Sequence, residues 1–167
     1  MNFGIIYGIS SFGLARNLGI SRTQAKQYID AYFTQYPEIK TYMDETIQFA
    51  QTNGFVKTPI GRRIYIDGFN SPATRQFAQR SAINAPIQGG AADIIKMAMI
   101  RVFKVLAESQ LDITPLLQVH DELIFEVADK DIEPAQKIIK ENMEKVIQLS
   151  VPLVVEVGVA KNWLAAH

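Results

Sequence analysis

Two adjacent carboxylates, Asp121 and Glu122, stand between two apolar runs and directly follow one of the two histidines of the chain. The apolar residues are Leu116, Leu117 and Val119 on one side and Leu123, Ile124, Phe125 and Val127 on the other. This pattern predicts a strand, a tight turn and a second strand, with both acids at the bend. Carboxylates held side by side can bind a hard divalent cation, which prefers oxygen ligands. Acidic residues are also common in hairpin turns as solvated turn formers, so the local pattern leaves both interpretations open.

Composition limits the kinds of site that the chain can build. With 167 residues, 48% of them hydrophobic, it has the size of one domain or of two small lobes that share a core. It has no cysteine, and its two histidines, His120 and His167, are far apart, so we expect neither a disulfide nor a zinc site. No apolar run approaches the roughly 20 residues that span a bilayer, and the N-terminus does not resemble a signal peptide. We therefore expect a cytoplasmic protein without membrane contact, in which any metal is bound through oxygen.

The charges cancel over the whole chain but are unevenly distributed. Seventeen basic residues balance seventeen acidic ones. Residues 55–80 contain five basic residues and one acidic residue, whereas residues 121–145 contain eight acidic residues and four lysines. A basic region ahead of an acidic one suits a nucleic-acid enzyme that holds phosphates and metals in different places. Scattered surface charge would give the same counts, so this interpretation needs support from elsewhere in the chain.

The first part of the sequence predicts helices and one small hairpin. Ser10 or Ser11 can cap a helix that ends at Gly19, and Ser21 with Gln24 forms a capping-box pattern at the start of the next one. Pro37 ends that helix and begins another, which runs to Asn53. Residues 55–58 and 62–66 flank Pro59-Ile60-Gly61 and predict a hairpin with its arginines near the turn.

The second part predicts longer helices and a sheet. We expect a helix over residues 73–83, a break at Asn84-Ala85-Pro86, and a largely apolar helix over residues 91–108 that is buried at the centre of its lobe. An amphipathic helix over 132–149 and a strand over 153–159 follow the acidic hairpin. The strand would complete a small antiparallel sheet. The predicted fold class is α+β, mostly helical at first and then an antiparallel sheet packed on helices.

Four blocks of this sequence resemble the C-terminal part of the bacterial DNA polymerases of family A. They are Asn2–Gly8 with Phe12–Ala15, Tyr32–Phe33 with Tyr36–Pro37, Gly61–Arg63 with Arg80–Gly89, and Gln118–Leu123. The resemblance extends over essentially the whole chain, to Val155–Gly158 and Asn162–Trp163. It implies that residues 1–69 are part of a fingers subdomain and residues 70–167 the C-terminal part of a palm subdomain.

The resemblance also implies an activity, which is templated nucleotidyl transfer from deoxynucleoside triphosphates to a DNA primer with two Mg²⁺ ions. Such ions neutralise the charge that builds on the attacking and leaving oxygens. By position, Asp121 resembles a metal-binding catalytic aspartate, with Glu122 supporting the same site. The implied DNA-binding residues are Arg80, Asn84, Gln88, Gln118 and His120, and the implied nucleotide-binding residues are Phe3 and Tyr7. In the family, the residue matching His120 approaches the primer terminus, and those matching Arg80, Asn84 and Gln88 contact the minor groove.

Three departures from the family pattern set further expectations. The family's second metal-binding aspartate and its triphosphate-binding lysine have no counterpart in these 167 residues, and Gly90 stands where the family often has threonine. We therefore expect a polymerase fragment that is inactive alone, and that needs the N-terminal part of the polymerase or self-associates through an exposed palm edge. In the cell we expect the polymerase at the bacterial nucleoid, on primer–template DNA.

Two alternative functions stay open. A noncatalytic DNA-binding module would use the basic region 55–80 alone and would be indifferent to Asp121 and to magnesium. A metal-dependent phosphoesterase would use His120, Asp121 and Glu122, but the sequence offers no other clustered ligands for it.

Overall fold

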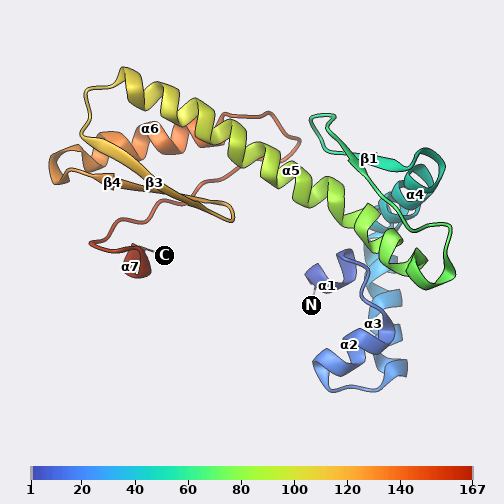
Figure 1. Cartoon of the computed structure of the whole chain (residues 1–167). Coiled ribbons are helices and arrows are strands. Elements are labelled where there is room, and N and C mark those ends of the chain that lie inside the picture. Colours follow the sequence, from blue (N-terminus) through green and yellow to red (C-terminus); the bar gives the residue numbers. More distant parts are fainter. Residues whose placement is uncertain (1, 167) are drawn as a thin grey trace. The chain divides into compact units, whose positions relative to one another are not determined.

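The computed structural model describes the backbone of residues 2–166 and the side chains of residues 4–166. The chain forms two compact units, Met1–Gly90 (unit 1) and Ala91–His167 (unit 2). This division falls later in the chain than the expected subdomain boundary at residues 69 and 70, and the assignment to fingers and palm stays a prediction. Helices dominate unit 1 and a two-stranded antiparallel sheet lies in unit 2, which confirms the α+β class (Figure 1). Within the described residues, no helix is long and apolar enough to cross a membrane.

The first helices of unit 1 begin and end where the sequence signals predict. Helix α1 spans Asn2–Ile6 and α2 spans Ser11–Leu18, where the Ser10 hydroxyl accepts a hydrogen bond from the Gly13 amide at 3.1 Å. Gly19 ends α2 in the left-handed conformation, with φ 65°. Helix α3 (Arg22–Gln35) begins with the complete capping box of Ser21 and Gln24. Local chemistry therefore sets these boundaries, as expected.

Helix α4 and the first hairpin also follow the prediction. Helix α4 spans Pro37–Asn53, with its proline in the first turn. Strands β1 (Phe55–Lys57) and β2 (Arg63–Tyr65) pair antiparallel, with Val56 opposite Ile64. Val56 belongs to a core cluster of unit 1, and the buried residues of this cluster are Ala50, Val56, Ile66, Phe69, Ala78 and Ala82. Val56 thus anchors the inner face of the hairpin in this core.

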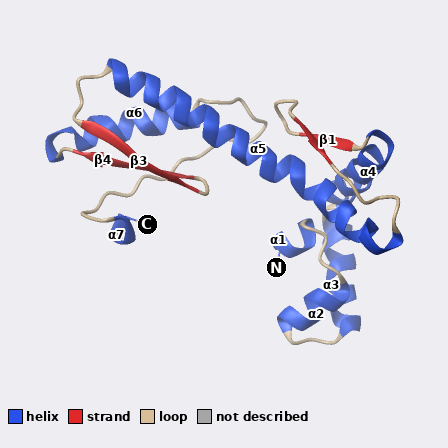
Figure 2. Ribbon diagram, viewed as in Figure 1, coloured by secondary structure: helices blue, strands red, loops and turns tan. Residues whose placement is uncertain are grey.

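The predicted break near Pro86 is wrong, because α5 runs without interruption over Pro72–Glu108 with Pro86 inside it (Figure 2). An interior proline removes one backbone hydrogen bond and is unfavourable in a helix. Contacts with the hairpin hold the helix together here. A Cβ atom on Gly89 would lie 2.6 Å from Ile64 Cδ1, and one on Gly90 would lie 2.8 Å from Pro59 Cδ. The two glycines let the hairpin pack directly on the helix backbone, so tertiary contact outweighs the local helix-breaking signal.

The part of α5 in unit 2 is buried along one face rather than on all sides, so the expectation of a central buried helix is also wrong. Ala98, Val102 and Leu106 are buried and recur every four residues. Ile100, on another face, is 72% exposed. Val102 and Leu106 of this stripe pack with Ala135 and Ile139 of α6 (Ile132–Glu144), forming the core of unit 2.

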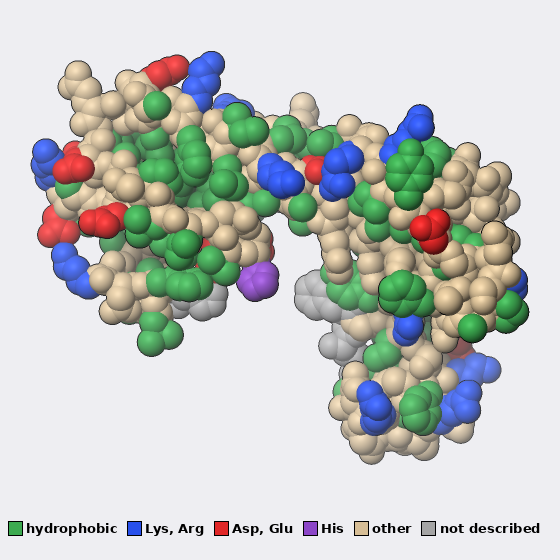
Figure 3. All heavy atoms as spheres, viewed as in Figure 1, with side chains coloured by type: hydrophobic (Ala, Val, Ile, Leu, Met, Phe, Trp, Pro, Cys, Tyr) green, Lys and Arg blue, Asp and Glu red, His purple; other side chains and the backbone are tan. Residues whose placement is uncertain are grey.

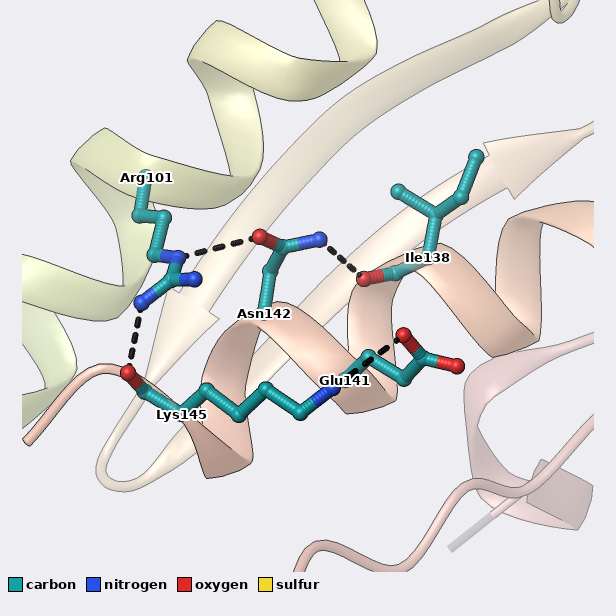
Figure 4. Close-up of polar contacts among 5 residues, drawn as sticks. All are labelled: Arg101, Ile138, Glu141, Asn142 and Lys145. Carbon is teal, nitrogen blue, oxygen red and sulfur yellow. Dashed lines mark hydrogen bonds and ion pairs between the residues drawn. The ribbon is translucent and has the colours of Figure 1, made fainter. Parts of the chain in front are cut away.

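Helix α6 ends at Glu144, five residues before the predicted end at residue 149. A contact with α5 accounts for the early stop. The Arg101 guanidinium donates to the Lys145 carbonyl at 2.5 Å and to the Asn142 side-chain oxygen at 3.0 Å (Figure 4). Carbonyls at a helix C-terminus have no partner within the helix, and a cationic donor there is favourable. A short 3₁₀ helix, η1 (Asp129–Asp131), precedes α6.

The predicted strand over residues 153–159 is wrong. In the part of the chain that the structure describes, this segment joins no sheet, and β3 (Ile113–Val119) pairs with β4 (Glu122–Val127) alone. The Val155 amide donates instead to the Glu144 carboxylate at 3.1 Å. Gly158 lies so close to the Ala166 backbone that a Cβ atom would overlap the carbonyl oxygen. The segment that connects α6 to α7 (Trp163–Ala166) is therefore held by a side-chain hydrogen bond and by a close backbone contact.

Candidate functional site

The tip of the β3–β4 hairpin has a defined and strained geometry. Val119 pairs with Glu122, so the turn between them consists of His120 and Asp121. His120 has φ 51°, the left-handed region that costs an ordinary residue about 1–2 kcal/mol. The Gln118 side-chain amide donates to the His120 carbonyl at 2.6 Å across this turn. Gln118, which was predicted to contact DNA, therefore stabilises the strained turn at His120 that presents the two acids.

The two carboxylates at this tip differ in their surroundings. Asp121 is exposed, whereas Glu122 is half-buried and its Oε2 accepts a hydrogen bond from the Trp163 indole at 3.3 Å. This contact fixes one side of the Glu122 carboxylate and leaves Asp121 open to solvent. Trp163 is a site residue that the sequence did not predict. It is the single tryptophan of the chain and lies in a block that resembles the family, and these two features are the signal that could have identified it.

The hairpin tip can supply two oxygen ligands to a metal ion. No group of three His, Cys, Asp or Glu side chains in the described residues could hold one. Two carboxylates nevertheless fit Mg²⁺, which usually keeps several waters and binds through one or two protein carboxylates plus substrate phosphates. Other acidic side chains gather over β4 and the segment that follows it, at the opposite end of the strand from the turn (Figure 3). The donor set at the tip therefore fits part of a metal site.

Three predicted DNA-binding residues share one face of α5 in unit 1. Arg80, Asn84 and Gln88 are spaced four residues apart, which places them in one row along the helix. Arg80 and Gln88 are exposed and Asn84 is half-buried. Among the described residues, the buried side-chain oxygen of Asn84 has no hydrogen-bond partner, which is unfavourable in a folded protein. Arg80 and Gln88 thus present hydrogen-bond donors to solvent, and the Asn84 oxygen is an acceptor without a donor.

The turn after α1 lies against the first member of this row. Gly8 has φ 73°, and a Cβ atom there would lie 3.2 Å from Arg80 Cγ. Tyr7, the neighbour of Gly8, is half-buried. The structure thus places the turn that follows the predicted nucleotide-binding Tyr7 against the predicted DNA-binding Arg80. The side chain of Phe3 lies outside the described residues.

The candidate residues therefore form two groups. Gln118, His120, Asp121 and Glu122 lie together at the hairpin tip in unit 2. The row Arg80, Asn84 and Gln88 lies in unit 1, and the turn at Gly8 that follows Tyr7 approaches its first member. The first group offers carboxylates for a cation, and the second offers an aromatic ring and donors for a nucleic acid.

Comparison with known proteins gives one consistent result. The model of the family described as DNA polymerase family A matches residues 1–165. The chain is 50% identical over 168 residues to DNA polymerase I of Lactococcus lactis subsp. cremoris, covering 99% of this chain and 19% of that protein. It is 49% identical over 169 residues to DNA polymerase I of Pseudomonas aeruginosa, covering all of this chain and 18% of that one.

A solved structure agrees with these relatives. It is the POL domain of Pol1 from M. smegmatis in complex with DNA primer-template and dNTP, which matches with a TM-score of 0.95 and 40% identity. The match covers 99% of this chain and 30% of that chain. The present chain thus spans about a fifth of the length of the curated relatives described above. With the family model matching nearly every residue, the chain belongs to DNA polymerase family A.

Proposed function

We propose that the chain is part of a DNA-directed DNA polymerase and contributes half of its metal-binding carboxylates. The observation that carries this proposal is the pair of carboxylates at the hairpin tip, Asp121 exposed and Glu122 bound to the Trp163 indole. The reaction is templated nucleotidyl transfer, in which a primer 3′ hydroxyl attacks the α-phosphate of a deoxynucleoside triphosphate and pyrophosphate leaves. When bound, two Mg²⁺ ions neutralise the charge that develops on the attacking and leaving oxygens.

The residues at the hairpin tip have separate tasks in this proposal. Asp121, open to solvent, is the metal ligand of this chain. Glu122 supports the same site with its orientation fixed by Trp163. His120 lies beside the acids and is exposed, so it is available to the primer terminus. Gln118 holds the turn through the His120 carbonyl at 2.6 Å, which keeps the acids in position before the substrate arrives.

The residues of unit 1 hold the DNA and the nucleotide in this proposal. The minor-groove acceptors are shared by all correct base pairs, so a few donors on one helix face can test the shape of a pair without reading its sequence. Arg80, Asn84 and Gln88 provide such a row. Tyr7 precedes the Gly8 turn that approaches Arg80, and it is proposed to offer a ring near the templating base. Phe3 is proposed to contact the incoming nucleotide.

On this proposal the isolated 167-residue chain incorporates no nucleotide. No group of three His, Cys, Asp or Glu side chains among the described residues could hold a metal ion, so the chain alone offers too few ligands for a two-metal site. The rest of the polymerase is then its partner. Residues 1–69 as fingers, residues 70–167 as palm, and work at the nucleoid belong to the same proposal.

Primer extension by the polymerase that contains this chain tests the proposal. We expect Asp121→Asn to lower the single-turnover rate by about 100-fold or more, since a metal site contributes several kcal/mol to such reactions. Asp112→Asn is the matched control, because Asp112 is an exposed aspartate that precedes β3. An unchanged rate in Asp121→Asn would refute the proposal and favour a noncatalytic DNA-binding module. Hydrolysis of simple phosphodiesters by the isolated chain would favour the phosphoesterase.

A further inference from the structure

The outer face of the hairpin β1–β2 carries two aromatic and two basic residues in cross-strand pairs. Phe55 is opposite Tyr65, and Lys57 is opposite Arg63. Side chains alternate between the two faces of a strand, so these four share one face. Val56, between them on β1, points into the core of unit 1. The four residues therefore form an outward surface, here named the outer hairpin face.

Aromatic rings are arranged in a row at this face. Phe55 contacts Phe49 of α4 edge to face, with ring centroids 5.6 Å apart, and contacts Tyr65 at 6.1 Å. Tyr65 is 71% exposed and Phe49 is 40% exposed. An open ring beside other rings provides a flat apolar platform, and the bases of a single strand stack on such platforms without regard to sequence.

Positive charge accompanies the rings. The Arg63 guanidinium carbon lies 4.7 Å from the centroid of the Phe55 ring, a cation–π contact, and both Arg63 and Lys57 are exposed. From Gln48 to Ile66 the chain has three basic residues and no acidic one. The third basic residue, Arg62, donates to the Gly89 carbonyl of α5 at 3.1 Å. The hairpin thus leaves two cations facing outward beside the rings, where they can contact phosphates.

We propose that the outer hairpin face binds single-stranded DNA, with a base stacked on Tyr65 and backbone phosphates bound by Lys57 and Arg63. An acidic peptide would use the two cations but not the open ring, so the combination favours a polynucleotide. The choice of DNA rests on the proposed function. None of the four residues belongs to the hairpin tip of unit 2 or to the α5 row of Arg80, Asn84 and Gln88.

The test measures binding of a fluorescein-labelled 12-nucleotide oligo(dT) by the full chain, by anisotropy at low salt. Tyr65→Ala should weaken binding about tenfold, the typical contribution of one stacked base. Tyr65→Phe keeps the ring and should bind like the wild type. Arg63→Gln should lower the slope of log affinity against log salt by about 0.7, the value for one phosphate contact on a single strand. Tyr28→Ala, which removes a 50% exposed tyrosine on α3, is the matched control.

The outcomes separate the possible explanations. Unchanged binding by Tyr65→Ala, an equal loss in Tyr28→Ala, or no binding of oligo(dT) by the wild type would each overturn the inference. Displacement of the oligonucleotide by polyglutamate as readily as by unlabelled oligo(dT) would point to an acidic protein and also overturn it. Circular dichroism melting of each variant excludes unfolding as the cause of a loss. The proposed function fails separately, since primer extension tests Asp121 whereas oligonucleotide binding tests Tyr65.

Discussion

Gly89 should be a position at which alanine, the best helix former, destabilises a helix. It lies inside α5, where replacement of glycine by alanine ordinarily stabilises by about 1 kcal/mol. A Cβ atom here would lie 2.6 Å from Ile64 Cδ1, 3.0 Å from Thr58 Cγ2 and 3.2 Å from an Arg62 guanidinium nitrogen. All three neighbours belong to the hairpin that packs on the helix, so the added methyl group must displace them.

The magnitude follows from two opposing contributions. Overpacking a well-packed contact costs about 1–3 kcal/mol, which exceeds the gain in helix propensity of about 1 kcal/mol. We therefore expect Gly89→Ala to lower the free energy of unfolding by about 1 kcal/mol, and Tm by about 2–4 °C for a chain of this length. Gly4→Ala is the control. A Cβ atom on Gly4, also in a helix, would meet Ile9 at an ordinary distance of 3.6 Å, so this change should be neutral or stabilising.

A double-mutant cycle isolates the responsible contact. Ile64→Val removes the Cδ1 atom that the new methyl group would meet. If the close approach is the cause, Gly89→Ala should be less destabilising in the Ile64→Val chain than in the wild type. Urea unfolding followed by circular dichroism at 222 nm measures all four chains. A stabilising effect of Gly89→Ala in the wild type, or strictly additive changes, would refute the packing argument.

Two further predictions concern contacts of α5. The Tyr42 hydroxyl donates a hydrogen bond to the Ile83 carbonyl at 3.2 Å, and burial raises the pKa of this hydroxyl. The contribution of the neutral hydroxyl to stability is therefore present below pH 10, the pKa of an unfolded tyrosine, and is lost as the pH rises through the higher folded-state pKa. Tyr42→Phe should unfold about 1 kcal/mol more easily than the wild type in urea at pH 8, and a difference that does not shrink above pH 10 would contradict this. Arg101→Met should lower the free energy of unfolding by about 1 kcal/mol, because the Lys145 carbonyl at the end of α6 loses its donor. Lys104 is another cation on α5, and Lys104→Met should lower the free energy of unfolding much less. Equal effects of the two variants would indicate that the loss of positive charge, and not of the hydrogen bond, is the cause.

The elements that the sequence predicts correctly are those whose boundaries depend on neighbouring residues. Ser10 and Ser21 cap α2 and α3 through hydrogen bonds to residues three positions along the chain. Pro37 lies in the first turn of α4, and the two-residue turn at His120 and Asp121 joins the predicted strands. Such signals act within one turn of the backbone, so a single sequence contains them in full.

The elements that the sequence predicts wrongly depend on contacts between distant residues. Pro86 predicts a break, but Pro59 and Ile64 pack on the glycines that follow it and the helix continues. Residues 153–159 have the alternation of a strand, but an amide of this segment is bound by Glu144. Neither contact leaves a local signal, because each joins residues more than ten positions apart.

The candidate site divides in the same way. The adjacent acids and the spacing of Arg80, Asn84 and Gln88 are visible in the sequence. The contact between Trp163 and Glu122 joins residues 41 positions apart, and the close approach of Gly8 to Arg80 spans most of unit 1. The sequence could therefore predict the chemical groups, but the hydrogen bonds that orient them required the structure.

The position of the two carboxylates depends on all of unit 2 rather than on the turn alone. A two-stranded hairpin is marginally stable without further packing. Here Phe125 of β4 meets Phe103 of α5 edge to face at 6.2 Å, so α5 supports the sheet at one end. At the other end, the Trp163 indole of α7 donates to Glu122. The segment before α7 passes so close to the Ala166 backbone at Gly158 that no side chain fits there. Any change that releases α7, including Gly158→Ala, should therefore remove the Trp163 hydrogen bond from Glu122 while leaving the acidic residues themselves intact.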